Sequence, residues 1–235
     1  MTTVWCWLAI AATNSTSTMS SCTTILMKKF SSVSGHSLFT LVLVYFDDIL
    51  VAGNDISQIK IFKKVLSTHF KIKDLGSLKY FLGLDVARSP NNIFLNQCKY
   101  ALDILSDSGQ LGAQTASFPM EQHLKLNNQD GDLLPDPCLY RRLIGRLIYL
   151  TITKPDIVYA FNIFSQFMHA PRVPHMTAAT RVLCYIKGSP GQGIFFPSSN
   201  SLDVTTYTDS DWASCPTTHR STTRYFIQLD TNPIS

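Results

Sequence analysis

Two adjacent carboxylates, Asp47 and Asp48, lie between two apolar segments, LVLVYF before them and ILVAG from residue 49 onward. Apolar runs on both sides of a short polar step predict a buried hairpin with the acids at its turn. Carboxylates near a buried turn are costly unless they are paired or bind metal. The pattern therefore favours a site for a divalent cation that holds phosphate. A solvated turn whose two aspartates face water is the alternative.

The residues around this turn predict the elements that hold it. Residues 37–53 form a strand pair that turns at 45–48, and Asp55 is the N-cap of a helix over 57–70. A second hairpin is expected over 78–96, with SPNN as its turn, followed by a helix over 98–108. The apolar spacing predicts that the inward side chains of the two helices are Ile59, Phe62, Val65, Leu66, Phe70, Ala101, Leu102 and Leu105.

The second half of the chain is predominantly helical by its apolar spacing. A polar segment rich in Pro and Gly, residues 127–137, separates it from the first half. Three helices follow, the second of which begins near Pro155, and short strands are expected near 194–196, 204–208 and 224–229. The predicted inward side chains are Leu139, Leu143, Ile144, Leu147, Ile148, Ile157, Ala160, Phe161, Phe164, Phe167, Ala178, Val182, Leu183 and Ile186.

Composition narrows the class of protein. With 235 residues, 45% hydrophobic and 15% charged, the chain can build one large or two ordinary domains. The net charge of +4 comes from scattered basic residues, which permits contact with nucleic acid without arguing for it. None of the six cysteines forms a CxxC pair, and no histidine cluster has metal spacing. Because signal-peptide and membrane-spanning patterns are lacking, we expect an intracellular protein with no membrane contact.

Several longer strings share one resemblance. The string YFDDILVAGND resembles the YxDD hairpin of copia-type retrotransposon reverse transcriptases. Residues 74–105 look like the part of that family between palm and thumb, and residues 140–175 with 181–196 look like its connecting region. The segment that begins YTDSDW is similar to the start of its ribonuclease H domain. Together these segments cover residues 37–229 in order.

The resemblance implies roles for particular residues. Asp47 ligates catalytic Mg²⁺, Asp48 supports that site, and Tyr45 packs near the primer end. Phe81, Leu82 and Gly83 resemble the primer grip. Asp209 matches a ribonuclease H metal ligand, and Asp211 is the weaker candidate for that role. The implied partners are an RNA or DNA primer-template, dNTP and other parts of the Pol polyprotein.

The sequence also departs from the family. Residues 1–46 contain no Asp or Glu, although the family carries a further metal-binding aspartate upstream of its hairpin. After Asp211 the only acid is Asp230, and Arg224 stands where the family has glycine. We therefore interpret the chain as a fragment whose ancestor performs two-metal, template-directed DNA synthesis and which is inactive in isolation. The alternatives are a non-catalytic nucleic-acid-binding remnant and a fragment without a stable role.

These observations predict an α+β fold in four parts. Residues 1–36, rich in Ser and Thr, form a poorly ordered leader. Residues 37–126 form a partial reverse-transcriptase palm and thumb built from β-hairpins and a helix, and residues 127–197 form a helical connection. Residues 198–235 supply incomplete ribonuclease H-like strands.

Overall fold

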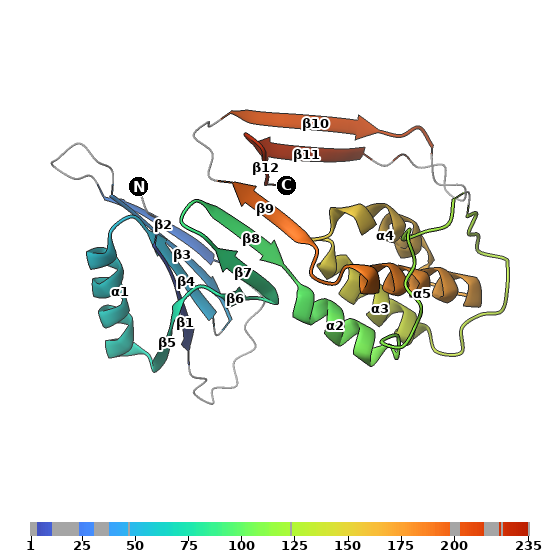
Figure 1. Ribbon diagram of the computed structural model, residues 1–235, viewed down its shortest axis with the longest axis horizontal. Coiled ribbons are helices and arrows are strands. Elements are labelled where there is room, and N and C mark those ends of the chain that lie inside the picture. The colour runs from blue at the N-terminus through green and yellow to red at the C-terminus, as the bar shows by residue number, and fades with distance from the viewer. Residues whose placement is uncertain are drawn as a thin grey trace. The chain divides into compact units, whose positions relative to one another are not determined.

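The computed structural model describes residues 4–10, 24–30, 38–46, 48–122, 124–197, 203–213, 221 and 223–234. The chain divides into two compact units, Met1–Leu82 and Gly83–Ser235 (Figure 1). The break between them follows a short strand rather than the polar segment 127–137. The assignment of the parts to palm, thumb, connection and ribonuclease H stays a prediction.

An antiparallel five-stranded sheet forms the first unit, with the order β2-β3-β4-β1-β5. One helix, α1, packs against the sheet, and a two-residue strand ends the unit (Figure 1). The elements are β1 (Val4–Ile10), β2 (Thr24–Phe30), β3 (Leu38–Tyr45), β4 (Asp48–Gly53), α1 (Ile56–His69), β5 (Ile72–Ser77) and β6 (Tyr80–Phe81). The predicted hairpin and helix are confirmed, including Asp55 as the N-cap, whose carboxylate accepts from the Ser57 N–H at 2.8 Å.

The leader predicted for residues 1–36 holds two strands of this sheet. β1 pairs with β4 and β5, and β2 pairs with β3. The strings VWCWLAI and TILMKKF lie between Ser/Thr-rich segments that give no strand signal. They form strands because they pair with strands more distant in the sequence. These two segments thus have regular secondary structure where a poorly ordered leader was predicted, and the rest of 1–36 lies outside the described residues.

A helical core and two small sheets form the second unit (Figure 1). In one sheet β8 pairs with both β7 and β9. In the other, β11 pairs with β10 and β12, and all of these pairings are antiparallel. The elements are β7 (Leu84–Arg88), β8 (Asn92–Asn96), α2 (Cys98–Asp107), α3 (Pro137–Leu150), η1 (Pro155–Ile157), α4 (Val158–Phe164), η2 (Ser165–Phe167), α5 (Val173–Gly188), β9 (Gly193–Pro197), β10 (Val204–Ser210), β11 (Thr223–Leu229) and β12 (Asn232–Pro233). The predicted helices and C-terminal strands are confirmed.

Burial follows the predicted helical faces with specific exceptions. Every inward residue predicted on α4 and α5 is buried, as are Ile144 and Leu147 on α3. The exceptions are Val65, Phe70, Leu102, Leu139 and Ile148, all of them more than 40% exposed. Helical spacing marks a stripe wider than the surface that neighbouring helices cover, so residues at the edge of the stripe face solvent. No helix in the described ranges is both long and apolar enough to cross a bilayer.

His175, near the start of α5, is buried in a fixed protonation state. Its Nδ1 accepts the Arg172 N–H at 3.0 Å, and its Nε2 lies 2.9 Å from the Asn127 carbonyl oxygen. The ring stacks on Phe167 with a centroid separation of 4.0 Å. Only a neutral ring with its proton on Nε2 satisfies both contacts. Burial lowers the pKa of His175 below its usual value, and the nearby Arg172 charge lowers it further.

We expect acid to weaken this part of the fold. The folded state binds a proton on His175 less readily than the unfolded chain does. The contribution of neutral His175 to the free energy of unfolding is therefore complete above pH ~6.5 and declines as the pH falls below that value. Urea unfolding at pH 5 and pH 7.5 measures the difference. His175→Gln should shrink it, and His169→Gln, at an exposed position, should not. An equal pH dependence in all three proteins would contradict the assignment.

Candidate functional site

The candidate site is the turn between β3 and β4. Tyr45 and Asp48 are paired residues of the two strands, so the connection consists of two residues, Phe46 and Asp47. Phe46 has φ of 46°, in the left-handed region that two-residue hairpin turns require, and its ring meets Tyr45 edge-on with centroids 4.9 Å apart. Asp47 lies outside the described residues. The structure thus confirms the predicted hairpin and leaves the role of Asp47 as a prediction.

The strand register decides which face of the sheet carries Asp48. Ile49 and Val51 of β4 form a buried cluster with Ile59 of α1. Side chains alternate along a strand, so Asp48 lies on the other face, away from α1. Tyr45 is paired with Asp48 and lies on that same face. The two predicted site residues are therefore brought together on the side of the sheet opposite the helix, half-buried at the end of the hairpin.

The strand beside Asp48 adds no acid. β1 runs antiparallel to β4, and Ala9 is the residue paired with Asp48. Across the described residues, no group of three or more His, Cys, Asp or Glu side chains is close enough to share a metal ion. Carboxylate oxygens are the ligand type that Mg²⁺ prefers, and one or two of them, completed by water and substrate phosphate, hold a single ion. By residue type and position Asp48 is suited to that partial role, whereas Asp47 lies outside the described residues and its role stays a prediction.

The segment predicted as a primer grip forms a second tight turn. Phe81 is buried in β6, and Leu82 and Gly83 follow with φ of 49° and 76°. A left-handed conformation at two successive residues reverses the chain, so the first strand of the hairpin predicted over 78–96 is interrupted after Phe81. The positive φ of Gly83 favours glycine at this position, while a Cβ there would meet the Tyr149 ring in ordinary contact, at 3.4 Å.

The C-terminal acids lie in the other unit, at the end of β10. Asp209 is exposed and is paired with Arg224 of β11. The Arg224 guanidinium lies 3.8 Å from an Asp211 carboxylate oxygen and 6.0 Å from the centre of the Tyr159 ring. The sequence marks Arg224 as a departure from the family's glycine but does not reveal this contact, because strand register is not visible in a sequence. A cation of the protein's own therefore lies beside the predicted metal ligands.

The fold also buries polar residues that no sequence pattern marks, among them Lys154 and Tyr140. Lys154, 1% exposed, donates from Nζ to the carbonyl oxygens of Ser189 and Gln192 at 2.8 and 3.1 Å. Burial lowers the pKa of Lys154, although the nearby Asp156 acts in the opposite direction. Tyr140, fully buried, donates to the Phe164 carbonyl oxygen at 2.9 Å. Lys154 thus ties the residue before η1 to the connection between α5 and β9, and Tyr140 ties α3 to the end of α4. Neither residue has a local sequence signal beyond its own polarity.

Comparison with known proteins gives the ancestry. Residues 9–122 match the family model for reverse transcriptase (RNA-dependent DNA polymerase). The matched segment begins inside the Ser/Thr-rich stretch 1–36. No solved structure matches the chain.

Three relatives show the extent of the similarity. A retrovirus-related Pol polyprotein from transposon RE2 of Arabidopsis thaliana is 41% identical over 212 residues, which is 87% of this chain and 15% of the polyprotein. The Pol polyprotein from transposon TNT 1-94 of Nicotiana tabacum is 30% identical over 222 residues, covering 90% of this chain and 16% of that protein. An uncharacterized mitochondrial protein of Arabidopsis thaliana, AtMg00810, is 41% identical over 195 residues, 83% of this chain and 80% of its own length.

This chain therefore spans about 15% of the length of the Pol polyproteins that it matches. The predicted resemblance is confirmed: the chain belongs to the reverse transcriptase family of copia-type retrotransposon Pol polyproteins.

Proposed function

We propose that the chain supplies the metal-binding hairpin of an RNA-directed DNA polymerase, with Asp47 and Asp48 as its magnesium ligands. The observation that carries the proposal is the two-residue turn between β3 and β4, which holds Asp48 beside Tyr45 on the sheet face away from α1. A carboxylate fixed at the end of a buried strand is already oriented, so ion binding costs little further ordering. Magnesium bound there would neutralise charge on the nucleotide phosphates.

The same geometry supports a second part of the proposal, that the chain alone does not copy a template. Two-ion phosphoryl transfer needs carboxylates from more than one segment. Residues 1–46 contain none, and the partner of Asp48 in β1 is Ala9. The remaining ligands would come from other parts of a Pol polyprotein. In that assembly Tyr45 would lie near the primer end, Phe81, Leu82 and Gly83 would position the primer, and the substrates would be primer-template and dNTP.

Manganese binding tests the first part, because Mn²⁺ occupies magnesium sites and is paramagnetic. The spin-resonance signal of free Mn²⁺ should fall on titration with the chain, and Asp47→Asn should weaken binding about tenfold or more, since a carboxylate ligand becomes a neutral amide. Asp55→Asn is the matched control, because Asn remains a good N-cap for α1. Equal binding by Asp47→Asn and the parent chain would refute the ligand assignment.

Primer extension tests the second part. We expect no incorporation of dNTP on an RNA template by the 235-residue chain at any magnesium concentration. Retention of the duplex without synthesis would favour the non-catalytic alternative. Template copying by the chain, abolished by Asp47→Asn, would show that the site is complete and overturn this part of the proposal.

For the C-terminal acids we propose that Asp209 is a metal ligand of ribonuclease H type and that Arg224 competes with the ion. The guanidinium beside Asp211 lowers the attraction of this site for a divalent cation. Arg224→Ala should therefore raise Mn²⁺ binding several-fold, and adding Asp209→Asn should remove the gain. The comparison is best made with Asp47→Asn present in every variant, so that the hairpin contributes little. Unchanged binding in Arg224→Ala would count against Asp209.

A further inference from the structure

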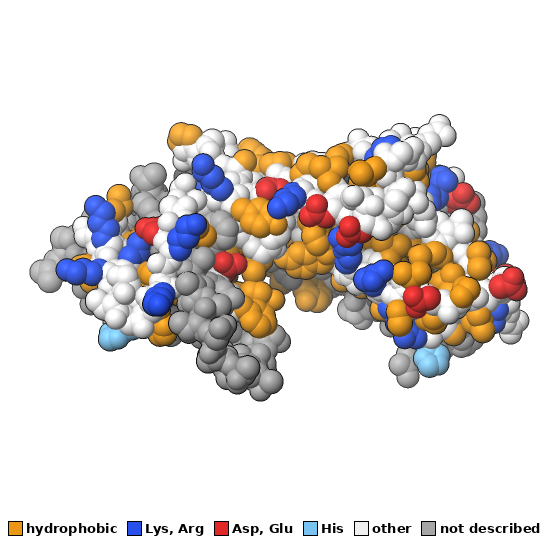
Figure 2. All heavy atoms as spheres, turned by 90° about the horizontal axis from the view of Figure 1, so that it is seen from below, with side chains coloured by type: hydrophobic (Ala, Val, Ile, Leu, Met, Phe, Trp, Pro, Cys, Tyr) orange, Lys and Arg blue, Asp and Glu red, His pale blue; other side chains and the backbone are white. Residues whose placement is uncertain are grey.

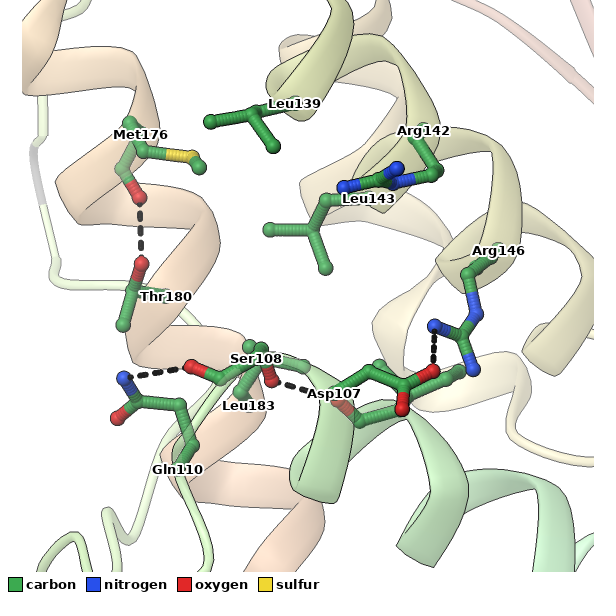
Figure 3. A pocket seen from close by; sticks show the side chains of 11 residues that line it. Asp107, Ser108, Gln110, Leu139, Arg142, Leu143, Arg146, Met176, Thr180 and Leu183 are labelled. Carbon is green, nitrogen blue, oxygen red and sulfur yellow. Dashed lines mark hydrogen bonds and ion pairs between the residues drawn. The ribbon is translucent and has the colours of Figure 1, made fainter.

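A cavity of about 570 Å³ lies among α2, α3 and α5, within the second unit (Figure 3). Its base is apolar, with Ile104, Leu143 and Leu183 contributed by the three helices. Leu139 and Met176 add to the apolar lining, and Leu139 is 45% exposed. Figure 2 shows hydrophobic side chains gathered on the helical part of the chain, with charged groups among them. Part of this apolar surface is thus left in water.

Most polar groups at the cavity already have partners. The Ser108 hydroxyl donates to the Ile104 carbonyl oxygen at 2.6 Å, and the Thr180 hydroxyl donates to that of Met176 at 2.9 Å. Arg146 pairs with Asp107 at 2.7 Å, as Figure 3 shows. These contacts leave a lining in which few polar groups need a ligand.

Arg142 is the exception. Its side chain extends from α3 beside Leu143 at the cavity, and it makes no hydrogen bond or ion pair with any described residue (Figure 3). Since Arg146 and Asp107 neutralise each other, the lining carries a net charge of one positive unit, from Arg142. A guanidinium presents two parallel N–H groups that match the two oxygens of a carboxylate.

We propose that this cavity binds an aliphatic monocarboxylate, with the carboxylate on Arg142 and the hydrocarbon chain along Leu139, Leu143, Met176 and Leu183. The volume falls within the roughly 300–1,000 Å³ of small-molecule sites. A single net charge suits a monoanion better than a doubly charged phosphate. A folded protein partner would require a surface of about 800 Å² on each side, which a single cavity does not supply. The proposal is independent of the polymerase assignment.

Calorimetric titration of the full chain with decanoate tests the proposal. We expect saturable binding of one decanoate per chain. Decanol, which keeps the hydrocarbon, and acetate, which keeps the charge, should each bind at least tenfold more weakly, because each loses one of the two contacts. Decyl phosphate distinguishes the anion classes and should bind more weakly than decanoate.

Variants locate the site. Arg142→Gln should weaken decanoate binding about tenfold or more, while Arg88→Gln, on β7 and outside the cavity lining, should leave it unchanged. Because Arg142 is exposed, we expect Arg142→Gln to have the melting temperature of the parent chain. An unchanged melting temperature would show that the variant is folded. Absence of decanoate binding, equal binding of decanol, or binding that survives Arg142→Gln would each overturn the proposal.

Discussion

Lys154→Ala is expected to destabilise the second unit by about 3 kcal/mol. The ammonium donates charge-assisted hydrogen bonds to two carbonyl oxygens just beyond α5, at Ser189 and Gln192. Such bonds contribute about 1.5–3 kcal/mol each, and water can replace only part of this, because Ser189 is half-buried while Gln192 is exposed. The burial that lowers the pKa of Lys154 offsets part of this, because the parent chain must desolvate the charge.

Two variants separate the charge from the packing of the side chain. Lys154→Met retains the length of the stem and removes only the donor, so it should lose roughly half as much stability as Lys154→Ala. Lys99→Met, at an exposed position on α2, should change stability by less than about 0.5 kcal/mol. The free energy of unfolding in urea gives all three values. A Lys154→Met variant as stable as the parent chain would mean that the two carbonyls find other donors.

Phe164→Ala should cost about 3–5 kcal/mol, because it opens a cavity at a fully buried site. The Phe164 ring meets Phe161 edge-on with centroids 5.9 Å apart, in the largest apolar cluster of the second unit. The matched control is Phe226→Ala on β11, where the same side chain is 40% exposed and should cost less than about 1.5 kcal/mol.

Calorimetry distinguishes the effect from general unfolding. Since the chain has two compact units, Phe164→Ala should lower the melting temperature of one transition by roughly 10 °C and leave the other in place. A uniform shift of the entire melting curve would show that the two units unfold as one. Equal destabilisation by Phe164→Ala and Phe226→Ala would contradict the assignment of the core.

Local patterns predicted most helices because each of them depends on signals within a few residues. Asp55 at the start of α1 and Pro155 before α4 are such signals, and the aspartates at a turn between apolar strings predicted the β3–β4 hairpin. What local patterns miss are features that depend on distant partners. β1 requires β4 and β5, and the position of Arg224 opposite Asp209 depends on strand register.

In the candidate site too, features set by neighbouring residues are predictable from the sequence, and features set by distant strands are not. The acids of the hairpin are adjacent in the sequence, so their chemistry is visible in it. That Asp48 lies on the face away from α1, with Ala9 as its neighbour, depends on the order of strands in the sheet. Nothing in the sequence distinguishes Arg142 from the other basic residues of α3, because the cavity beside it forms only where α2 and α5 pack next to α3.

The pairing of β8 with β9 joins Asn96 to Gly193, so the helical segment between them begins and ends at neighbouring points. Gly193 suits this junction, since a Cβ there would collide with the Leu95 carbonyl oxygen. During synthesis on a ribosome, β8 emerges long before β9 and must wait for the intervening helices. Closing so long a loop is slow unless those helices fold first and bring its ends together. The same closeness of ends makes the helical segment suitable for grafting into another host protein or for circular permutation.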